Sequence, residues 1–411
     1  MKLRYSVLFC ALPLVFSAPS TAHLLVNLNE FPEWFQQAME RETEIESTSQ
    51  LTIEALNVDA RIKGNATQQE STEGTWYYTI DIGLASLVEC YAFTEFDGPA
   101  NSLHAIVQHS LQGAAALNQK ALTSQFNLAV DAGVTGATPY LQLDTLYNLG
   151  EGSDTVSGVI KGLSAQTEQS LQICIHNETG YQATFLAVFE SFVEAFAQHN
   201  TNPQFFDAVY QLSLNDMPLG FSRERFTVDQ DGDIEVNVHS AMLVPVDEVS
   251  VSRTDSVGTE WSRADGTLIN GTEYSVDNGT LSSNFAIQPG EESWMVSGEM
   301  QGKAIEAPLN YNGPLISGYG SYTETAGLLA SEEQSAAFRM WVPDADPTAA
   351  LEVMVSKIED NPAANLRLDM GPLTMTLKAE DNGMFDVGTL EQAGMKLLMK
   401  RIYSKGEPVL P

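Results

Sequence analysis

From about Phe221 to the C-terminus, the chain alternates short β-prone runs with dipeptides that favour tight turns. Asparagine or aspartate followed by glycine suits a two-residue hairpin turn, because both positions adopt positive φ angles easily. Such pairs in this half include Asp231-Gly232, Asp265-Gly266, Asn270-Gly271, Asn278-Gly279 and Asn382-Gly383. Short strands joined by regular turns predict a mostly antiparallel β domain over residues 221–411, built as a sandwich, an open barrel or a curled sheet.

Two segments of this half are predicted to form different structures, a hairpin and a helix. Arg225–Val228 and Ile234–Val238 flank Asp231-Gly232 and predict a hairpin. Leu390–Tyr403 is predicted instead to form a C-terminal helix, which would carry the only dense group of basic side chains, Lys396, Lys400 and Arg401.

Residues 23–220 mix strand-like and helical patterns, so we predict an α/β-type mixed domain there and an α+β class for the whole chain. The expected strands are 75–82, 86–93 and 170–176, and the expected helices are 102–112, 182–198 and 202–214. The helix over 182–198 is the clearest, because Phe185, Phe189 and Phe192 recur at helical spacing. We place the domain boundary near Met217–Gly220.

The N-terminus has the order of a cleavable secretory signal over residues 1–22. Lys2 and Arg4 precede an apolar stretch, Tyr5–Phe16, and a segment of small residues then ends at Ala22. We expect cleavage after Ala22 and export to the periplasm or the extracellular medium. No later segment has the roughly 18 uninterrupted apolar residues that a membrane helix needs, so we expect no membrane span.

Export would leave two cysteines, Cys90 and Cys174, which we expect to form a disulfide in an oxidising compartment. The two cysteines also belong to a faint internal repeat at an offset of 84 residues, in which Ser86 corresponds to Ser170. In both copies a strand is expected to end in a short polar loop before a helix. A disulfide between these positions requires the two strands to be neighbours.

The two loops that follow the cysteine strands are the most site-like places in the sequence. One loop contains Glu95 and Asp97, and the other contains His176, Glu178 and Tyr181. A histidine near carboxylates can act as an acid or a base, and loops at strand ends often bind ligands. Glu95, Asp97, His176 and Glu178 are therefore the first catalytic candidates and Tyr181 is a ligand-binding candidate. The alternative is that these residues only cap helices and shape turns.

Other motifs point to no specific chemistry. Asp229, Asp231 and Asp233 resemble the start of a calcium loop, but Ile234 and Ser240 occupy the positions where that loop needs glycine and glutamate, so a tight hairpin turn explains the aspartates better. Gly318-Tyr319-Gly320-Ser321 is interpreted as a glycine-rich turn, since the serine-hydrolase elbow is absent. The phosphate-binding and zinc-binding motifs are also missing, so we expect no metal and no cofactor.

The net charge of the chain limits the kinds of partner that it can bind. The sequence holds 54 acidic and 20 basic residues and has a net charge of −34, which disfavours nucleic acid. Our leading hypothesis is an exported, non-catalytic binding or envelope protein that recognises a small molecule, a protein or a polymer. One alternative is a secreted hydrolase with an acid–base site built from distant residues. The other is a structural protein that assembles through the β domain.

Overall fold

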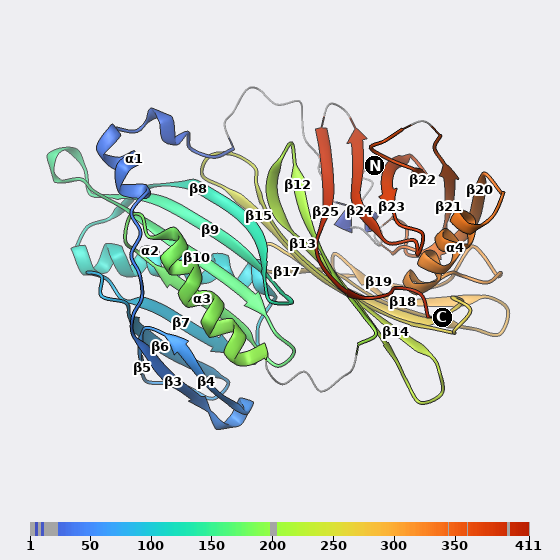
Figure 1. Ribbon diagram of the computed structural model, residues 1–411, viewed down its shortest axis with the longest axis horizontal. Helices are drawn as coiled ribbons and strands as arrows, with labels where there is room; N and C mark the ends of the chain where they lie inside the picture. Colours follow the sequence, from blue (N-terminus) through green and yellow to red (C-terminus); the bar gives the residue numbers. More distant parts are fainter. Residues whose placement is uncertain are drawn as a thin grey trace. The chain divides into compact units, whose positions relative to one another are not determined.

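The computed structural model describes residues 5–6, 10–11, 24–197, 204–343, 345–359, 361–392 and 395–410. The predicted signal at residues 1–22 lies outside the described residues except for the short paired strands β1 (Tyr5–Ser6) and β2 (Cys10–Ala11). The chain is built mostly of antiparallel β-sheets, and the described part contains four α-helices (Figure 1).

Two compact units divide the chain. The N-terminal unit contains Pro19–Thr201 together with Ala241–Thr254, and the C-terminal unit contains Asn202–Ser240 and Asp255–Pro411 along with the first 18 residues. Residues 217–220, near which the sequence suggested a boundary, lie inside the single strand β13 (Met217–Val228).

The N-terminal unit is organised around a seven-stranded sheet whose paired strands are all antiparallel. Its order across the sheet is β5 (Asn65–Gln68), β6 (Thr75–Asp81), β7 (Val88–Phe93), β11 (Leu171–His176), β10 (Val156–Gln166), β9 (Thr138–Leu149) and β8 (Leu122–Thr135). A separate hairpin joins β3 (Thr48–Ile53) to β4 (Val58–Lys63), and the short helix α1 (Glu33–Met39) precedes it. The strands predicted over 75–82, 86–93 and 170–176 are confirmed, but the α/β-type arrangement is not, since no strand pair here is parallel.

Helices cover both faces of this sheet. On one face, Ser164 of β10 donates a hydrogen bond to the Pro99 carbonyl at the start of α2 (Pro99–Asn118). On the other face, the adjacent Leu163 packs into a core with phenylalanines of α3 (Gln182–Ala197). Successive residues of a strand point to opposite faces, so α2 and α3 lie on opposite sides, as Figure 1 shows. Both helices were predicted from the sequence and are confirmed.

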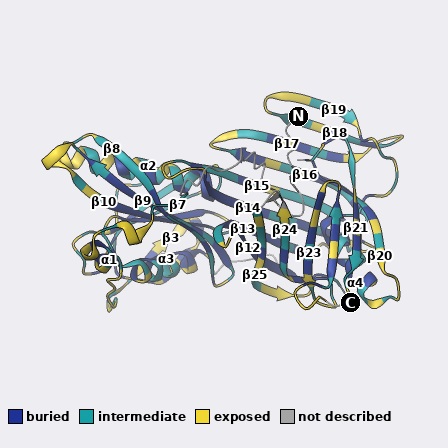
Figure 2. Ribbon diagram, turned by 90° about the horizontal axis from the view of Figure 1, so that it is seen from above, coloured by how far each residue is buried: buried dark blue, intermediate teal, exposed yellow. Residues whose placement is uncertain are grey.

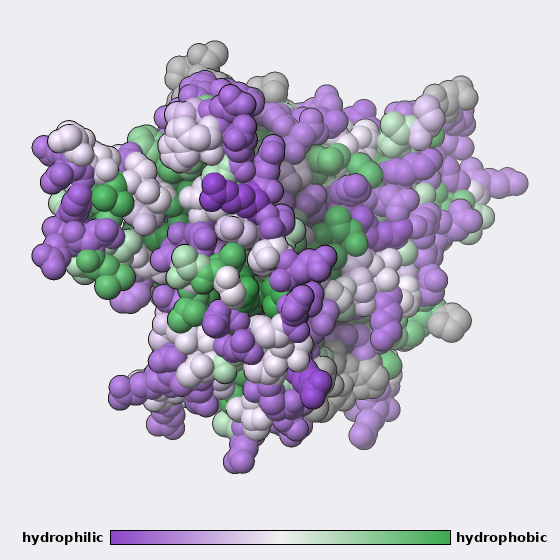
Figure 3. Space-filling model, turned by 60° about the vertical axis from the view of Figure 1, so that its left-hand side comes forward, coloured by the Kyte–Doolittle hydropathy of each residue, from purple (hydrophilic) through white to green (hydrophobic). Residues whose placement is uncertain are grey.

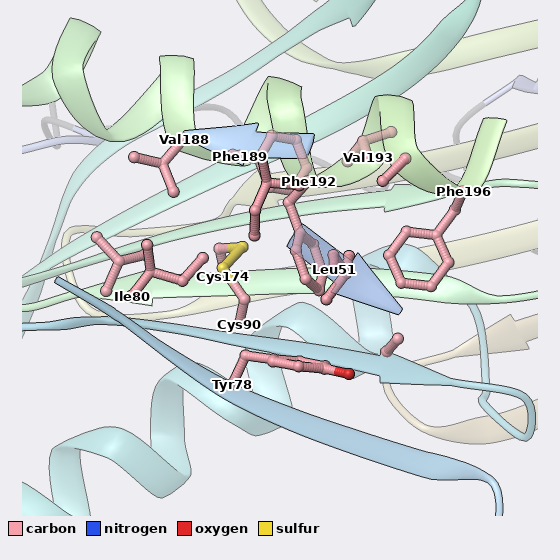
Figure 4. Close-up of a cluster of buried hydrophobic side chains, with 14 of the residues drawn as sticks. Leu51, Tyr78, Ile80, Cys90, Cys174, Val188, Phe189, Phe192, Val193 and Phe196 are labelled. Carbon is pink, nitrogen blue, oxygen red and sulfur yellow. A yellow bond between two sulfur atoms is a disulfide. The ribbon is translucent and has the colours of Figure 1, made fainter. Parts of the chain in front are cut away.

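The core beneath α3 contains the predicted disulfide. Cys90 of β7 lies directly opposite Cys174 of β11, and the two sulfur atoms are bonded. Phe189 and Phe192 point from α3 toward this bridge, as Figure 4 shows. Antiparallel neighbours make the bridge possible, because directly opposed residues bring their Cβ atoms within reach of a disulfide.

The C-terminal unit contains most of one fourteen-stranded sheet. Across the sheet the order is β19 (Lys303–Pro308), β18 (Trp294–Met300), β17 (Thr280–Pro289), β16 (Leu268–Asp277), β15 (Val251–Ser262), β14 (Ile234–Pro245), β13, β12 (Phe206–Leu214), β25 (Met395–Gly406), β24 (Phe385–Gln392), β23 (Leu373–Ala379), β22 (Leu366–Met370), β21 (Ala350–Lys357) and β20 (Ser335–Trp341). Helix α4 (Gly318–Ala330) packs against this sheet. The predicted mostly antiparallel β domain is confirmed, and its strands form one continuous sheet rather than the two separate sheets of a sandwich.

Most of the predicted hairpin turns are confirmed. Asp231-Gly232, Asp265-Gly266, Asn278-Gly279 and Asn382-Gly383 each join consecutive strands. Asn270-Gly271 is the exception, because both residues lie inside β16. Strands β22 and β23 alternate buried and half-buried or exposed residues, as the sequence predicted for 366–379 (Figure 2).

Two predicted helices are wrong. Within 202–214, residues 206–214 form β12, and the segment 390–403 supplies the end of β24 and most of β25. Strands β12 and β25 pair with each other from Phe206 to Leu214. Apolar residues stand at every second position of β12 from Phe206 to Leu214, with Asp207, Gln211 and Ser213 between them. The sequence therefore does contain the period of two that is typical of a strand, and the helix prediction overlooked it. The basic residues of 390–403 lie along β25, where Lys396 and Lys400 are exposed.

Candidate functional site

The antiparallel pairing of β7 and β11 separates the two loops that the sequence singled out. Phe93 at the end of β7 lies opposite Leu171 at the start of β11, and Glu89 lies opposite Ile175. The loops after the two strands therefore leave from opposite ends of the pair, about 20 Å apart for six-residue strands. Glu95 and Asp97 are exposed in the loop after β7. They do not meet the residues after β11.

His176 and Glu178 do come together, through a residue that the site prediction did not include. The Ser86 hydroxyl lies 3.1 Å from Nε2 of His176 and 3.1 Å from Oε2 of Glu178. The Ser86 backbone N–H also donates to Oε2 of Glu178, at 3.2 Å. The contacts therefore tie the turn before β7 to the loop after β11.

The protonation of this trio argues against a serine nucleophile. Burial, together with the charge of Lys161, lowers the pKa of His176 to about 3, so its ring is neutral. Both contacts are satisfied when Ser86 donates to the Glu178 carboxylate and accepts from the His176 N–H. In this arrangement the His176 ring donates a hydrogen bond to the serine oxygen, so it does not act as the base that would activate a serine nucleophile.

A row of ionisable residues crosses the sheet beside this trio. Asp144, Lys161 and His176 occupy opposed positions on β9, β10 and β11, and each is at most 3% exposed. The Lys161 ammonium donates to the Gly180 carbonyl and lies 5.6 Å from the ring centroid of Phe185. Burial lowers the pKa of Lys161 and raises the pKa of Asp144, since each loses hydration of its charged form.

Tyr181 lies directly before α3, and its backbone helps to fix the start of that helix. Its backbone adopts a φ of 59°, and its N–H donates to the Arg41 carbonyl at 2.5 Å. Glu42 then caps the helix by accepting hydrogen bonds from the N–H groups of Ala183 and Thr184, both at 2.8 Å. Burial opposes the charge of Glu42, but the hydrogen bonds, that of the Thr184 hydroxyl first, keep its pKa below the usual range.

Together, these residues form a polar cluster that connects α3, β9, β10 and β11. Within the described part of the chain, no group of three or more His, Cys, Asp or Glu side chains is placed to hold a metal ion. The aspartates of the calcium-like motif form the β13–β14 turn, where the Asp229 carboxylate accepts the N–H groups of Asp231 and Asp233.

A second place, which the sequence analysis missed, is an apolar hollow in the C-terminal unit. It lies between α4 and strands β20–β24 and has about 50 Å³ of space in which a water-sized molecule can move. Its lining residues are Ser321, Tyr322, Thr325, Phe338, Met340, Val342, Leu351, Val353, Leu368, Met370, Leu377, Gly383 and Phe385. Ligand-binding sites of proteins commonly have this apolar character, although they are usually larger.

Two of the predicted turns hold α4 in place above the hollow. Gly266 lies so close that a Cβ atom on it would be 2.5 Å from the Gly320 Cα atom. A Cβ atom on Gly383 would be 2.7 Å from the Tyr322 carbonyl oxygen. Because backbone touches backbone at both turns, the distance between α4 and the sheet cannot change by side-chain motion alone.

A buried polar chain lies behind the hollow. The Tyr322 hydroxyl donates to Oε2 of Glu224 at 2.5 Å and lies 3.1 Å from the Tyr210 hydroxyl. Tyr210 stacks on Phe385, with ring centroids 4.5 Å apart. Burial raises the pKa of Glu224 to about 7, because the carboxylate loses its hydration.

Glu224→Gln tests this burial through the pH dependence of stability. The folded-state pKa of about 7 exceeds the ordinary value of 4.5, so the folded protein binds the extra proton and loses stability as the pH rises through this window. The wild type should lose about 3 kcal/mol relative to Glu224→Gln between these limits. Urea unfolding over the pH range measures the difference, and two parallel stability curves would refute the assignment.

The sequence contains a signal for only one of the elements that line the hollow, helix α4. Gly318-Tyr319-Gly320-Ser321, interpreted as a turn, begins α4, and the preceding Ser317 caps the helix by accepting from the Gly320 N–H at 3.0 Å. A serine before a helical run is a recognised start signal. The strands that complete the lining are far apart in the sequence, so no local pattern brings them together.

No helix in the described ranges is both long enough and apolar enough to cross a membrane. The face turned toward the viewer in Figure 3 is mostly hydrophilic, with a hydrophobic group of residues near its centre.

The sequence and the fold were compared with known proteins. No family model matches the sequence, and no curated protein matches it. The chain is similar to a solved beta-barrel-like protein of a domain of unknown function, DUF1849, from Brucella abortus, at 13% identity and a TM-score of 0.39, over 50% of this chain and 99% of that chain.

Proposed function

We propose that this protein is an exported, non-catalytic binding protein that takes an apolar small molecule into the hollow beneath α4. The observation that supports this proposal is the composition of the lining, in which all the residues contributed by strands β20–β24 are apolar. Apolar surface around an open space favours any ligand that removes it from water, at roughly 25 cal/mol per Å².

The hydrolase alternative has less support. It required Glu95, Asp97, His176 and Glu178 to converge, and only the last two share a hydrogen-bonded neighbour. The assembly alternative relied on exposed sheet edges. Edge strand β19 carries Lys303, Glu306 and Pro308, which are residues that discourage edge pairing.

Filling the hollow should abolish binding. Val353 lines it at 2% exposure, whereas its neighbour Met354 faces away at 41% exposure. Val353→Phe should weaken the binding of the neutral fluorescent probe N-phenyl-1-naphthylamine by at least about tenfold, since the added ring occupies the ligand's space. Met354→Phe on the same strand is the matched control and should bind normally.

Fluorescence titration measures both variants, and thermal unfolding verifies that each is folded. Equal affinity for the two folded variants would place the probe elsewhere on the protein. Absence of probe binding to the wild type would contradict the proposed function itself.

A further inference from the structure

Another hollow in the C-terminal unit is polar and much larger than the one beneath α4. It is open toward solvent and has about 900 Å³ of space in which a water-sized molecule can move. This volume lies within the range of known small-molecule sites. Its lining comes mainly from the turn between β17 and β18, residues 290–293, and from residues 308–312 at the end of β19 and beyond it. Strands β18 and β19 form one edge of the fourteen-stranded sheet.

Backbone hydrogen bonds fix the two lining segments beside each other. Strands β18 and β19 pair directly. The Leu309 N–H then donates to the Trp294 carbonyl at 2.8 Å, and the Asn310 N–H donates to the Thr348 carbonyl at 2.9 Å. Groups that are already in position lose little conformational entropy when a ligand binds, so this framework suits a binding site.

Tyr311 contributes a half-buried aromatic ring to the lining. The guanidinium group of Arg339 lies over this ring, with its central carbon 5.2 Å from the ring centroid. Gly313 is also close, because a Cβ atom on it would lie 2.3 Å from the Tyr311 hydroxyl oxygen. These contacts hold the ring in one orientation, and a fixed aromatic ring provides a large contact area for apolar CH groups.

Four polar side chains of the lining have hydrogen-bonding groups available for a ligand. Glu291, Glu292, Asn310 and Asn312 are exposed, and their side chains make no hydrogen bond or ion pair with any residue that the structure describes. A carboxylate only accepts hydrogen bonds, whereas an amide both donates and accepts them. The hollow therefore presents donors and acceptors around one aromatic ring.

This set of groups matches the chemistry of a sugar. Each sugar hydroxyl both donates and accepts hydrogen bonds, and the CH groups of a sugar ring can pack on an aromatic side chain. The net charge of −34 disfavours anionic ligands. An organic polycation would suit the two carboxylates, but it has only donors and cannot pair with the amide N–H groups. We infer that this hollow binds a neutral oligosaccharide through its free carboxylates and amides and packs it against Tyr311.

The test is a ligand-observed NMR titration of the full chain with maltotetraose, cellotetraose, chitotetraose and mannotetraose. At least one of these neutral sugars should bind saturably, and its affinity should not change when salt is added. Tetragalacturonate, which is anionic, should bind at least about tenfold more weakly than that sugar. If none of the neutral tetrasaccharides binds at millimolar concentration, the inference is wrong.

Removal of the two amides assigns the binding to this hollow. Asn310→Ala/Asn312→Ala should weaken the binding of the sugar at least about tenfold, because two hydrogen-bonding groups are lost. Asn65→Ala/Asn284→Ala, at exposed positions of β5 and β17 outside the lining, is the matched control and should bind normally. Thermal unfolding verifies that both variants are folded. Equal affinity for the two variants would place the sugar elsewhere and overturn the inference.

A charge-removing variant separates a sugar from a cation. Glu291→Gln/Glu292→Gln keeps hydrogen-bond acceptors at both positions, so sugar binding should weaken by no more than about fivefold. If spermidine binds more tightly than every sugar and this variant abolishes its binding, the hollow is a cation site and the inference is wrong. The site does not depend on the hollow beneath α4, so Val353→Phe should bind the sugar normally and each proposal can fail without the other.

Discussion

Replacing Lys161 with methionine is expected to lower the unfolding free energy by about 3–5 kcal/mol at pH values above the pKa of Asp144, which burial raises to about 7. Lys161 is 0% exposed and lies opposite Asp144, whose carboxyl group is also buried. Removal of the ammonium group leaves Asp144 without its nearby opposite charge and the Gly180 carbonyl without its donor. An uncompensated buried charge is among the few changes that destabilise a protein this strongly.

The double variant Lys161→Met/Asp144→Asn should recover most of the loss. Asparagine removes the stranded charge, and its side-chain oxygen can still accept the hydrogen bond that Gln142 gives to Asp144 at 2.8 Å. Lys63→Met, on an exposed position of β4, is the control for loss of a lysine and should change stability little. Urea unfolding compares the variants, and a double variant no more stable than Lys161→Met would show that the two groups are not coupled.

The loss should also depend on pH in a defined direction. Burial already raises the pKa of Asp144, and removal of Lys161 raises it further. Protonation at acidic pH neutralises the stranded carboxylate. The difference between Lys161→Met and the wild type should therefore shrink as the pH falls below the pKa of Asp144.

Removing the Cys90–Cys174 bridge is expected to lower the unfolding free energy by about 3–5 kcal/mol. The bridge spans a sequence separation of 84 residues, so it restricts a large part of the unfolded chain. Both cysteines are 0% exposed within the core beneath α3. The variant Cys90→Ala/Cys174→Ala, compared with the oxidised wild type in urea, measures the effect.

Burial of the bridge also predicts its reactivity. A reductant reaches the sulfur atoms only when this region opens, so mass spectrometry of the native protein with dithiothreitol should show slow reduction that denaturant accelerates. Rapid reduction under native conditions would mean that the α3 core opens readily. A double-alanine variant as stable as the wild type would mean that the bridge does not restrict the unfolded chain.

The local patterns of the sequence were sufficient for several elements. Phenylalanines at helical spacing identified α3, and four asparagine-glycine or aspartate-glycine pairs marked real turns. The pairing of Cys90 with Cys174 followed from their being the two cysteines that remain after the predicted signal is removed. Each of these depends on neighbouring residues or on a count, which a sequence contains directly.

The arrangement of the candidate site could not be predicted from local sequence patterns. Whether Glu95 and His176 share one edge depends on the relative direction of β7 and β11, and no residue in either strand reports that direction. Ser86 was visible as a member of the repeat, but its place between His176 and Glu178 results from that same pairing.

What the sequence determined by itself, then, is the set of turns, the main amphipathic helices and the covalent bridge, because short-range backbone preferences and side-chain periodicity act within a few residues. Tertiary structure alone decided that 206–214 pairs with 395–406 and that α4 covers an apolar hollow. Side-chain periodicity can identify a strand, but it does not identify the distant strand with which it pairs. The hollow exists only once strands β20–β24 and α4, each apolar on one face for its own local reasons, are brought together.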